Sequence, residues 1–188
     1  IDLDYWKRGS NSSQDNCLIF TGVMDYQPNA EAALFLVEKI LPRVREMIPD
    51  VELLIVGRNP SAELIERTRS DSKITVTGFV DDLRPYLERA TVYVAPIHIA
   101  SGTQNKVVEA MAMQVPVVTT PVVGDGLRVE KDIVPPVREA ESEAEIAKQI
   151  VRLLKNREER MLLMTQGRRY VEDHFNWLRS AQILEEMC

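Results

Sequence analysis

Lys106 and Glu109 are charged residues in a segment, QNKVVEAMAM (104–113), in which apolar residues dominate. The apolar spacing predicts a helix entered from a turn at Gly102. Such a helix start has unpaired N–H groups and a positive dipole end, so it attracts anions. Lys106 in the first turn opposes that dipole, and a bound phosphate would reverse the cost. Glu109, on the same face, could accept hydrogen bonds from two ribose hydroxyls. The pair therefore fits a nucleoside diphosphate.

The same two residues allow a simpler interpretation. A Lys and a Glu three positions apart on an exposed helix face form a surface pair worth roughly a few tenths of a kcal/mol. Both side chains could equally be solvated without any partner. The residues alone leave these alternatives open.

The elements that must position this helix alternate between strand and helix along the chain. Short apolar runs predict strands at 17–23, 51–56, 74–77, 91–96 and 115–119, with a weaker strand near 132–134. Helical spacing predicts helices at 29–47, 62–69, 82–90, 104–113, 142–154, 158–174 and 177–187. This alternation is typical of right-handed βαβ units. We therefore predict an α/β fold: a Rossmann-like, doubly wound parallel sheet of about six strands with extra C-terminal helices.

Glycines lie at or beyond the ends of four of the predicted strands: Gly22, Gly57, Gly78 and Gly102. Strand-to-helix turns can need Gly for their own geometry, which explains any one of the four. Four such turns opening on the carboxyl edge of one parallel sheet favour a ligand pocket there. The GxGxxG and GxxxxGK[ST] motifs are both absent from the sequence, which argues against NAD enzymes and P-loop NTPases.

Composition narrows the class of protein. The chain has 188 residues, 45% hydrophobic and 28% charged, as in soluble globular proteins. The net charge of −6 argues against nucleic acid held by bulk charge. Two cysteines, Cys17 and Cys188, are too few for a disulfide framework, and no zinc-binding spacing or long apolar run occurs. The sequence has no signal peptide and opens without Met, so we expect a cytoplasmic protein and a piece of a longer chain.

A family resemblance rests on several motifs in order. The stretch VEAMAMQVPVVTTP (108–121) resembles the EAMAxGxPVV signature of family-four retaining glycosyltransferases with the GT-B fold. IFTGVMDYQPNAEAALFLVEKILP, VELLIVGRNP, ITVTGFVDDLRPYLERATVYVAPI and RRYVEDHFNWL resemble successive parts of their C-terminal, donor-binding domain. IDLDYW resembles the segment after the interdomain hinge. GTQNKVVEAMAMQVPVV looks most similar to bacterial exopolysaccharide sugar transferases linked to exosortase-type gene clusters.

The resemblance implies roles for particular residues. Glu109 would bind the donor ribose and Lys106 the phosphate. Other donor contacts would come from the strand-end turns: Gly57 and Arg58 at the pocket floor, Gly78, Phe79 and Val80 at the base, and Ser101, Gly102, Thr103 and Gln104 at the phosphates and sugar. Asp25 and His98 are further polar groups near this edge, with a structural role favoured for His98. Phe175 and Trp177 would anchor the last helix, with acceptor contact a lesser alternative.

The sequence also departs from the family pattern. Ser101 stands where the first Glu of the family's EX7E motif is expected, so only Glu109 remains of that pair. The stretch after the first strand lacks the Arg and Lys with which many relatives clamp the diphosphate. That charge would then fall to Lys106, the helix N-terminus and Arg58. Gln114 replaces a family Gly.

The resemblance implies three regions: a post-hinge segment and linker at 1–16, a nucleotide-sugar-binding domain at 17–174, and a helix at 175–188 that crosses to an N-terminal domain not included here. The implied reaction moves a sugar from a nucleoside diphosphate to an acceptor hydroxyl with retention and without a metal. It would serve exopolysaccharide or cell-surface glycan synthesis.

The implied acceptor is a glycan or lipid-linked glycan, and no nucleic acid is expected. The missing domain could bring the protein to the inner face of the membrane, and this chain alone would be inactive. Two alternatives remain: a non-catalytic nucleotide-binding or scaffold domain, and half of a sugar-nucleotide 2-epimerase.

Overall fold

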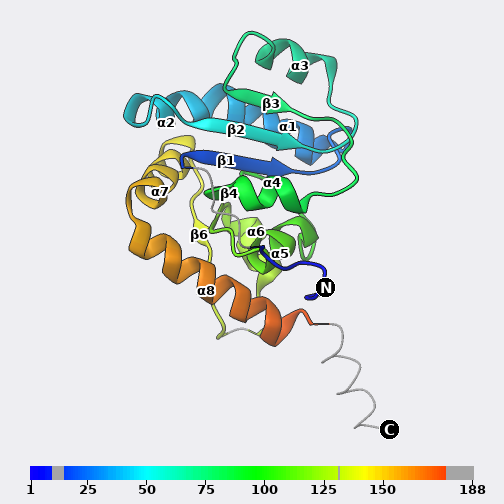
Figure 1. Cartoon of the computed structure of the whole chain (residues 1–188), viewed down its shortest axis with the longest axis vertical. Coiled ribbons are helices and arrows are strands. Elements are labelled where there is room, and N and C mark those ends of the chain that lie inside the picture. Colours follow the sequence, from blue (N-terminus) through cyan, green and yellow to red (C-terminus); the bar gives the residue numbers. More distant parts are fainter. Residues whose placement is uncertain (10–14, 131, 177–188) are drawn as a thin grey trace, which may run out of the picture.

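The computed structural model describes residues 1–9, 15–130 and 132–176. Its centre is a sheet of six strands in the order β3-β2-β1-β4-β5-β6, with every neighbouring pair parallel (Figure 1). The strands are β1 (Cys17–Thr21), β2 (Glu52–Val56), β3 (Ile74–Val76), β4 (Val92–Ala95), β5 (Val117–Thr119) and β6 (Arg138–Glu139). The predicted α/β class and six-stranded parallel sheet are confirmed.

The strand order reverses direction between β1 and β4, which are hydrogen-bonded neighbours. From β1 the chain winds outward through β2 to β3, and from β4 it winds the other way to β6. Loops that leave β1 and β4 therefore diverge and open a crevice at the carboxyl ends of these strands. Ligands of open α/β sheets bind at such a point.

A helix follows each of the six described strands. The helices are α1 (Gln27–Phe35), a π-helical turn η1 (Leu36–Ile40), α2 (Leu41–Met47), α3 (Ala62–Thr68), α4 (Arg84–Arg89), α5 (Asn105–Ala112), α6 (Pro121–Leu127), α7 (Glu143–Lys155) and α8 (Arg157–His174). The predicted helix over 29–47 is thus three consecutive pieces. Pro42 has no N–H to donate, and the Leu41 N–H bonds Leu36 O, five residues back, so the helix widens there.

Two predictions about the region after β5 were wrong. Helix α6, PVVGDGL, was not predicted, because two glycines within seven residues hide its helical character. The sixth strand pairs Arg138 with Val118, rather than lying near 132–134. Val134 is 68% exposed and precedes two prolines, which cannot donate to a strand ladder.

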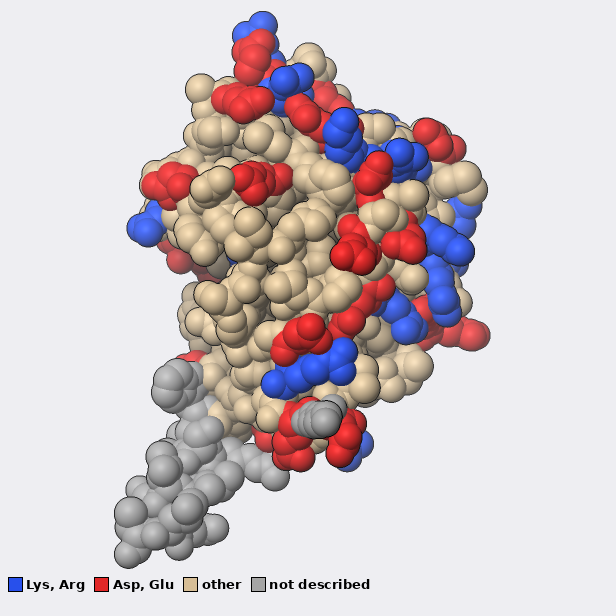
Figure 2. Space-filling model, turned by 180° about the vertical axis from the view of Figure 1, so that it is seen from behind, with Lys and Arg blue, Asp and Glu red and all other residues tan. Residues whose placement is uncertain are grey.

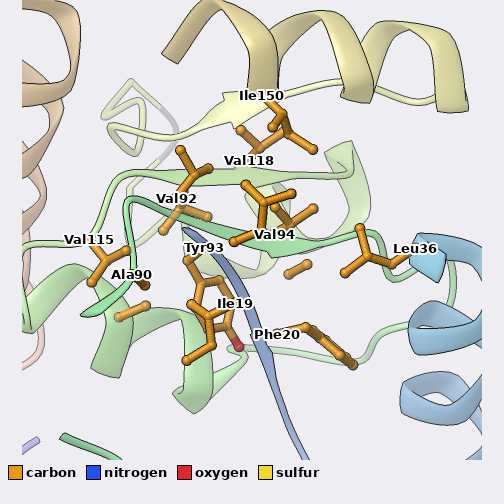
Figure 3. Packing of buried hydrophobic residues seen from close by; sticks show 14 of the residues in the cluster. Ile19, Phe20, Leu36, Ala90, Val92, Tyr93, Val94, Val115, Val118 and Ile150 are labelled. Atoms are coloured by element: carbon orange, nitrogen blue, oxygen red, sulfur yellow. The ribbon is translucent and has the colours of Figure 1, made fainter. Parts of the chain in front are cut away.

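The core lies on both faces of the sheet. All described side chains of β1, β4 and β5 are buried, as expected of parallel strands covered on two sides. Figure 3 shows Ile150 of α7 pointing toward Val118 of β5, whereas Tyr93 and Ile19 point away from α7. The Tyr93 hydroxyl is satisfied by Thr21 at 2.9 Å. Helix α5 contacts β4, β5 and α8.

The N-terminal segment 1–9 is attached to the far end of α5. Arg8 donates to the Gln114 carbonyl at 2.9 Å and to the Glu88 carbonyl at 2.9 Å. Arg168 of α8 donates to the Trp6 carbonyl at 2.6 Å and to the Ala112 carbonyl at 3.1 Å. Two guanidinium groups therefore satisfy carbonyls at the C-terminal end of α5, where cations are favourable.

Charge is mixed on the face seen in Figure 2: Lys and Arg side chains lie beside Asp and Glu on the right and in the lower part, and a broad area of uncharged atoms with a few acidic side chains covers the rest. In the described part of the chain, no helix is both long enough and apolar enough to span a membrane. The predicted helix 177–187, with Trp177, lies outside the described residues.

Candidate functional site

A cavity of about 570 Å³ opens at the carboxyl edge of the sheet, around the point where the strand order reverses. Its walls come from the last residues of β1 and β2 and from the segments that follow β1, β2, β3 and β4. They include Thr21, Gly22, Val23, Tyr26, Asn29, Val56, Gly57, Arg58, Phe79, Val80, Leu83, Thr103, Gln104, Asn105, Lys106 and Glu109. The cavity is thus where open α/β sheets bind ligands.

Helix α5 begins at this cavity. Gln104 is its N-cap residue and has extended backbone, and its side chain makes no capping bond. The first N–H groups of the helix are therefore left for a ligand or water. Lys106 and Glu109, one turn apart, both line the cavity.

The Lys106 side chain is half-buried against an uncharged amide and an aromatic ring. Its ammonium donates a hydrogen bond to Asn29 Oδ1 and lies 5.5 Å from the centre of the Phe20 ring. Burial lowers the pKa of Lys106 to about 8, and the nearby Glu109 carboxylate partly opposes this shift. A cation in this position would gain from a bound phosphate, which restores the interactions lost on leaving water.

Glu109 is half-buried as well, and burial raises its pKa while Lys106 lowers it. Among the residues that the structure describes, none donates a hydrogen bond to the Glu109 carboxylate, and Lys106 does not form an ion pair with it. The exposed Lys106–Glu109 surface pair is therefore not what the structure contains. Buried carboxylates normally have partners, so this one is open to hydrogen-bond donors from a ligand.

Glycine turns allow the loops after β1 and β2 to approach each other closely at the cavity. Gly57 has φ 150°, and a Cβ on it would lie 1.7 Å from the carbonyl oxygen of Gly22. Gly57 also forms an isolated bridge with Gly78, which has φ 72°. Only glycine fits at position 57, because any side chain would collide with backbone.

Eight of the predicted contact residues line the cavity, and three do not. The eight are Gly57, Arg58, Phe79, Val80, Thr103, Gln104, Lys106 and Glu109, whereas Gly78, Ser101 and Gly102 lie outside the lining. Gly78 shapes the floor through its bridge to Gly57. Thr103 donates to the Gly126 carbonyl at 2.9 Å, which attaches the loop to α6 and leaves Ser101 and Gly102 exposed.

The remaining polar candidates have other partners. Asp25 is exposed and accepts a hydrogen bond from Asn59 at 2.8 Å. His98 lies outside the lining and stacks edge-on against Phe35, with ring centres 5.1 Å apart. A packing contact of this kind agrees with the structural role favoured for His98.

Sequence reasoning missed several wall residues, and Asn29 is the most informative. It is 5% exposed, in the first turn of α1, with its amide between Lys106 and the Val23 carbonyl. A buried Asn in a helix that is otherwise apolar on its inner face was the available signal. Tyr26, 56% exposed, also lines the cavity.

A second cavity of about 540 Å³ lies on the other side of Glu109. It shares Thr103, Asn105 and Glu109 with the first, and its other walls are Ile1, Asp2, Trp6, Val108, His174 and Phe175. Phe175, expected to anchor the last helix, is partly buried against the core. Within the described ranges no group of three or more His, Cys, Asp or Glu side chains could hold a metal ion.

A family model described as "Glycosyl transferases group 1" matches residues 15–156, well over half of the chain. The chain belongs to this family. The matched residues include the six strands of the described sheet and all the wall residues of the first cavity. No curated protein matches the sequence.

Solved structures share the fold. The C-terminal domain of a glycosyl transferase group 1 family protein (LpcC) from Francisella tularensis is 17% identical, with TM-score 0.70, and the match covers 94% of this chain and 99% of that one. HepE from Anabaena, solved with UDP and glucose, is 12% identical with TM-score 0.78 over 100% of this chain and 54% of its own. Sucrose-phosphate synthase from Thermosynechococcus elongatus is 21% identical with TM-score 0.76, covering 100% and 51%.

The chain therefore spans about half the length of HepE and of the synthase. It corresponds to nearly the whole of the Francisella C-terminal domain. The fold is that of one half of a GT-B glycosyltransferase, and the predicted family is confirmed at that level.

Proposed function

We propose that this chain is the donor-binding half of a retaining glycosyltransferase that moves a sugar from a nucleoside diphosphate to an acceptor hydroxyl. The observation that carries the proposal is the start of α5: Lys106 and an unpartnered Glu109 carboxylate at the edge of one cavity, with the helix N-terminus open between its walls. Membership of the glycosyl transferases group 1 family agrees with this reading.

The charges suit the two ends of a nucleoside diphosphate. Lys106, the N–H groups at the start of α5 and the exposed Arg58 offer donors to phosphate oxygens. Glu109 offers acceptors to the two ribose hydroxyls. The base would lie against Phe79 and Val80, at the end of β3.

In the proposed reaction the bond between the anomeric carbon and the diphosphate oxygen breaks, and the acceptor oxygen bonds the same face of that carbon. The acceptor hydroxyl proton passes to the leaving diphosphate oxygen as the new bond forms. Negative charge grows on the leaving diphosphate, where Lys106 and the α5 N-terminus can stabilise it without moving. The proposal uses these fixed positive groups and requires no metal, so EDTA should leave nucleotide affinity unchanged.

The wider assignment follows from the same resemblance. A second, N-terminal domain would bind a glycan or lipid-linked glycan acceptor, and this chain alone would bind donor without turnover. The proposed role is cytoplasmic exopolysaccharide or cell-surface glycan synthesis, at the inner face of the membrane if the other domain binds there. The similarity of GTQNKVVEAMAMQVPVV to exopolysaccharide enzymes supports this role, and the half-length match to HepE supports a second domain.

Calorimetric titration of the chain with UDP, GDP and ADP tests the donor site. UDP is the first choice, because HepE was solved with UDP and with UDP-glucose. Micromolar to millimolar binding of one of the three would support the proposal, and no binding of any would refute it.

The second candidate, a non-catalytic nucleotide-binding domain, is favoured by Ser101 in place of an acidic residue. It predicts nucleotide binding with no preference for the sugar-bearing form, so titration with UDP-glucose beside UDP separates the two. Incubation with a nucleotide sugar and no acceptor would reveal a 2-epimerase by a changed sugar product.

A further inference from the structure

The amide of Asn29 is fixed in one orientation by two partners. Its nitrogen donates to the Val23 carbonyl at 2.9 Å, and its oxygen accepts from the Lys106 ammonium. A carbonyl only accepts and an ammonium only donates, so exchanging the two ends of the amide would lose both bonds. Asn29 is 5% exposed, and a Cβ on Gly22 would come within 2.9 Å of its amide nitrogen. The β1 loop therefore closes around this side chain.

Asn29 holds Lys106 without neutralising it. In the described residues, Lys106 makes its side-chain hydrogen bond to this uncharged amide and forms no ion pair with the neighbouring Glu109. One of the three ammonium N–H groups is used by Asn29, which leaves two for a ligand. An aspartate at this position would have nearly the same shape. It would lose the bond donated to the Val23 carbonyl, and its carboxylate would pair with Lys106 and consume the charge.

We propose that Asn29 is a positioning residue that sets the preference of the cavity for diphosphates over nucleosides, by aiming a Lys106 ammonium that it holds without an ion pair. The inference rests on the proposed function and deepens it. The loop after β1, GVMDYQPNAE, contains no Arg or Lys that could bind phosphate. Lys106 of α5, oriented by Asn29 of α1, would supply that positive charge instead.

The test compares Asn29→Asp with the unchanged chain by calorimetry at pH 7, using UDP, GDP and ADP and the matching nucleosides uridine, guanosine and adenosine. For the nucleotide that binds, we expect Asn29→Asp to weaken the diphosphate about tenfold or more, the scale of a charge-assisted hydrogen bond. The nucleoside should change by less than about twofold, because Lys106 is not assigned to it.

Two further variants supply the controls. Gln27→Glu adds the same charge in the same turn of α1 at an exposed residue outside the cavity lining, and should change diphosphate affinity by less than about twofold. In a Lys106→Met background, Asn29→Asp should have no further effect, because the two changes act through one group. Asn29→Ser, which is uncharged, should weaken the diphosphate less than Asn29→Asp, and its loss should also vanish with Lys106→Met.

Equal losses for diphosphate and nucleoside would overturn the inference, because they would show a purely structural role in the β1 loop. So would a full Asn29→Asp effect in the Lys106→Met background. If Asn29→Asp fails to fold by circular dichroism, the Asn29→Ser cycle with Lys106→Met decides by the same criterion. Failure of the unchanged chain to bind any of the three nucleotides would refute the proposed function, and this inference with it.

Discussion

Replacing Glu109 by Gln should weaken nucleotide binding without lowering the stability of the fold. The carboxylate lies between two cavities, is half-buried, and accepts no hydrogen bond from the described residues. In the proposed site it accepts from two ribose hydroxyls, and losing a charged hydrogen bond costs about 1.5–3 kcal/mol. The expected result is a nucleotide Kd about 10- to 150-fold higher.

The stability change follows from the raised pKa of Glu109. Burial is the main cause of that shift, and Lys106 opposes it. A carboxyl whose pKa is higher in the folded state than in the unfolded state destabilises the fold as pH rises through the window between the two pKa values. At pH 7, above the unfolded-state pKa, this penalty is present, so removing the ionisable group should leave the free energy of unfolding unchanged or raise it.

The assay pairs calorimetry against UDP, GDP and ADP with urea unfolding, both at pH 7. Glu46→Gln is the matched control, because Glu46 is exposed on α2 and lies outside both cavities. It should change neither quantity. Unchanged nucleotide affinity in Glu109→Gln together with a lower free energy of unfolding would refute the reasoning, since that combination identifies a structural carboxylate.

Three other outcomes are expected. Because the pKa of Lys106 is lowered to about 8, diphosphate affinity should fall by up to about tenfold between pH 7 and pH 9. In Lys106→Met the affinity should not change with pH. A pH dependence in that variant would assign the titration to another group. Gly57→Ala should lower the free energy of unfolding by about 2 kcal/mol or more, because the alanine Cβ would collide with the Gly22 carbonyl. An unshifted midpoint in urea unfolding would contradict the turn geometry. Gln114 has φ 54°, a backbone conformation that favours glycine, so Gln114→Gly should raise the free energy of unfolding by up to about 1 kcal/mol. A lower melting temperature would show instead that the Gln side chain stabilises the fold.

The sequence was most informative where one physical signal dominates. The strands were predictable because β1, β4 and β5 are continuous apolar runs, and α7 because Ser142 and Glu145 form a capping box. The start of α5 was predictable as well, because a Gly turn precedes an amphipathic helix. These signals are local, and they place Lys106 and Glu109 on one helix face without reference to any other segment.

Contacts between distant segments were not predictable in this way. Asn29 and Lys106 are separated by 77 positions and meet only because β1 and β4 are neighbours in the sheet. Strand β6 was misplaced because an edge strand of two polar residues carries no apolar pattern. Helix α6 was missed because its stability comes from packing, with Val123 and Leu127 buried, rather than from helix propensity.

Helix α5 is secured at one end and open at the other, and this asymmetry suits the proposed chemistry. Arg8 and Arg168 satisfy carbonyls at its C-terminal end, and through those bonds join it to segment 1–9 and to α8. At the N-terminal end, Asn29 holds Lys106 while the residues of the first turn line the cavity. Positive groups fixed before the ligand arrives need no reorganisation as charge develops on a leaving diphosphate, which is the condition for effective electrostatic stabilisation. The bonds that hold the C-terminal end of the helix would therefore contribute to catalysis by keeping its other end in place.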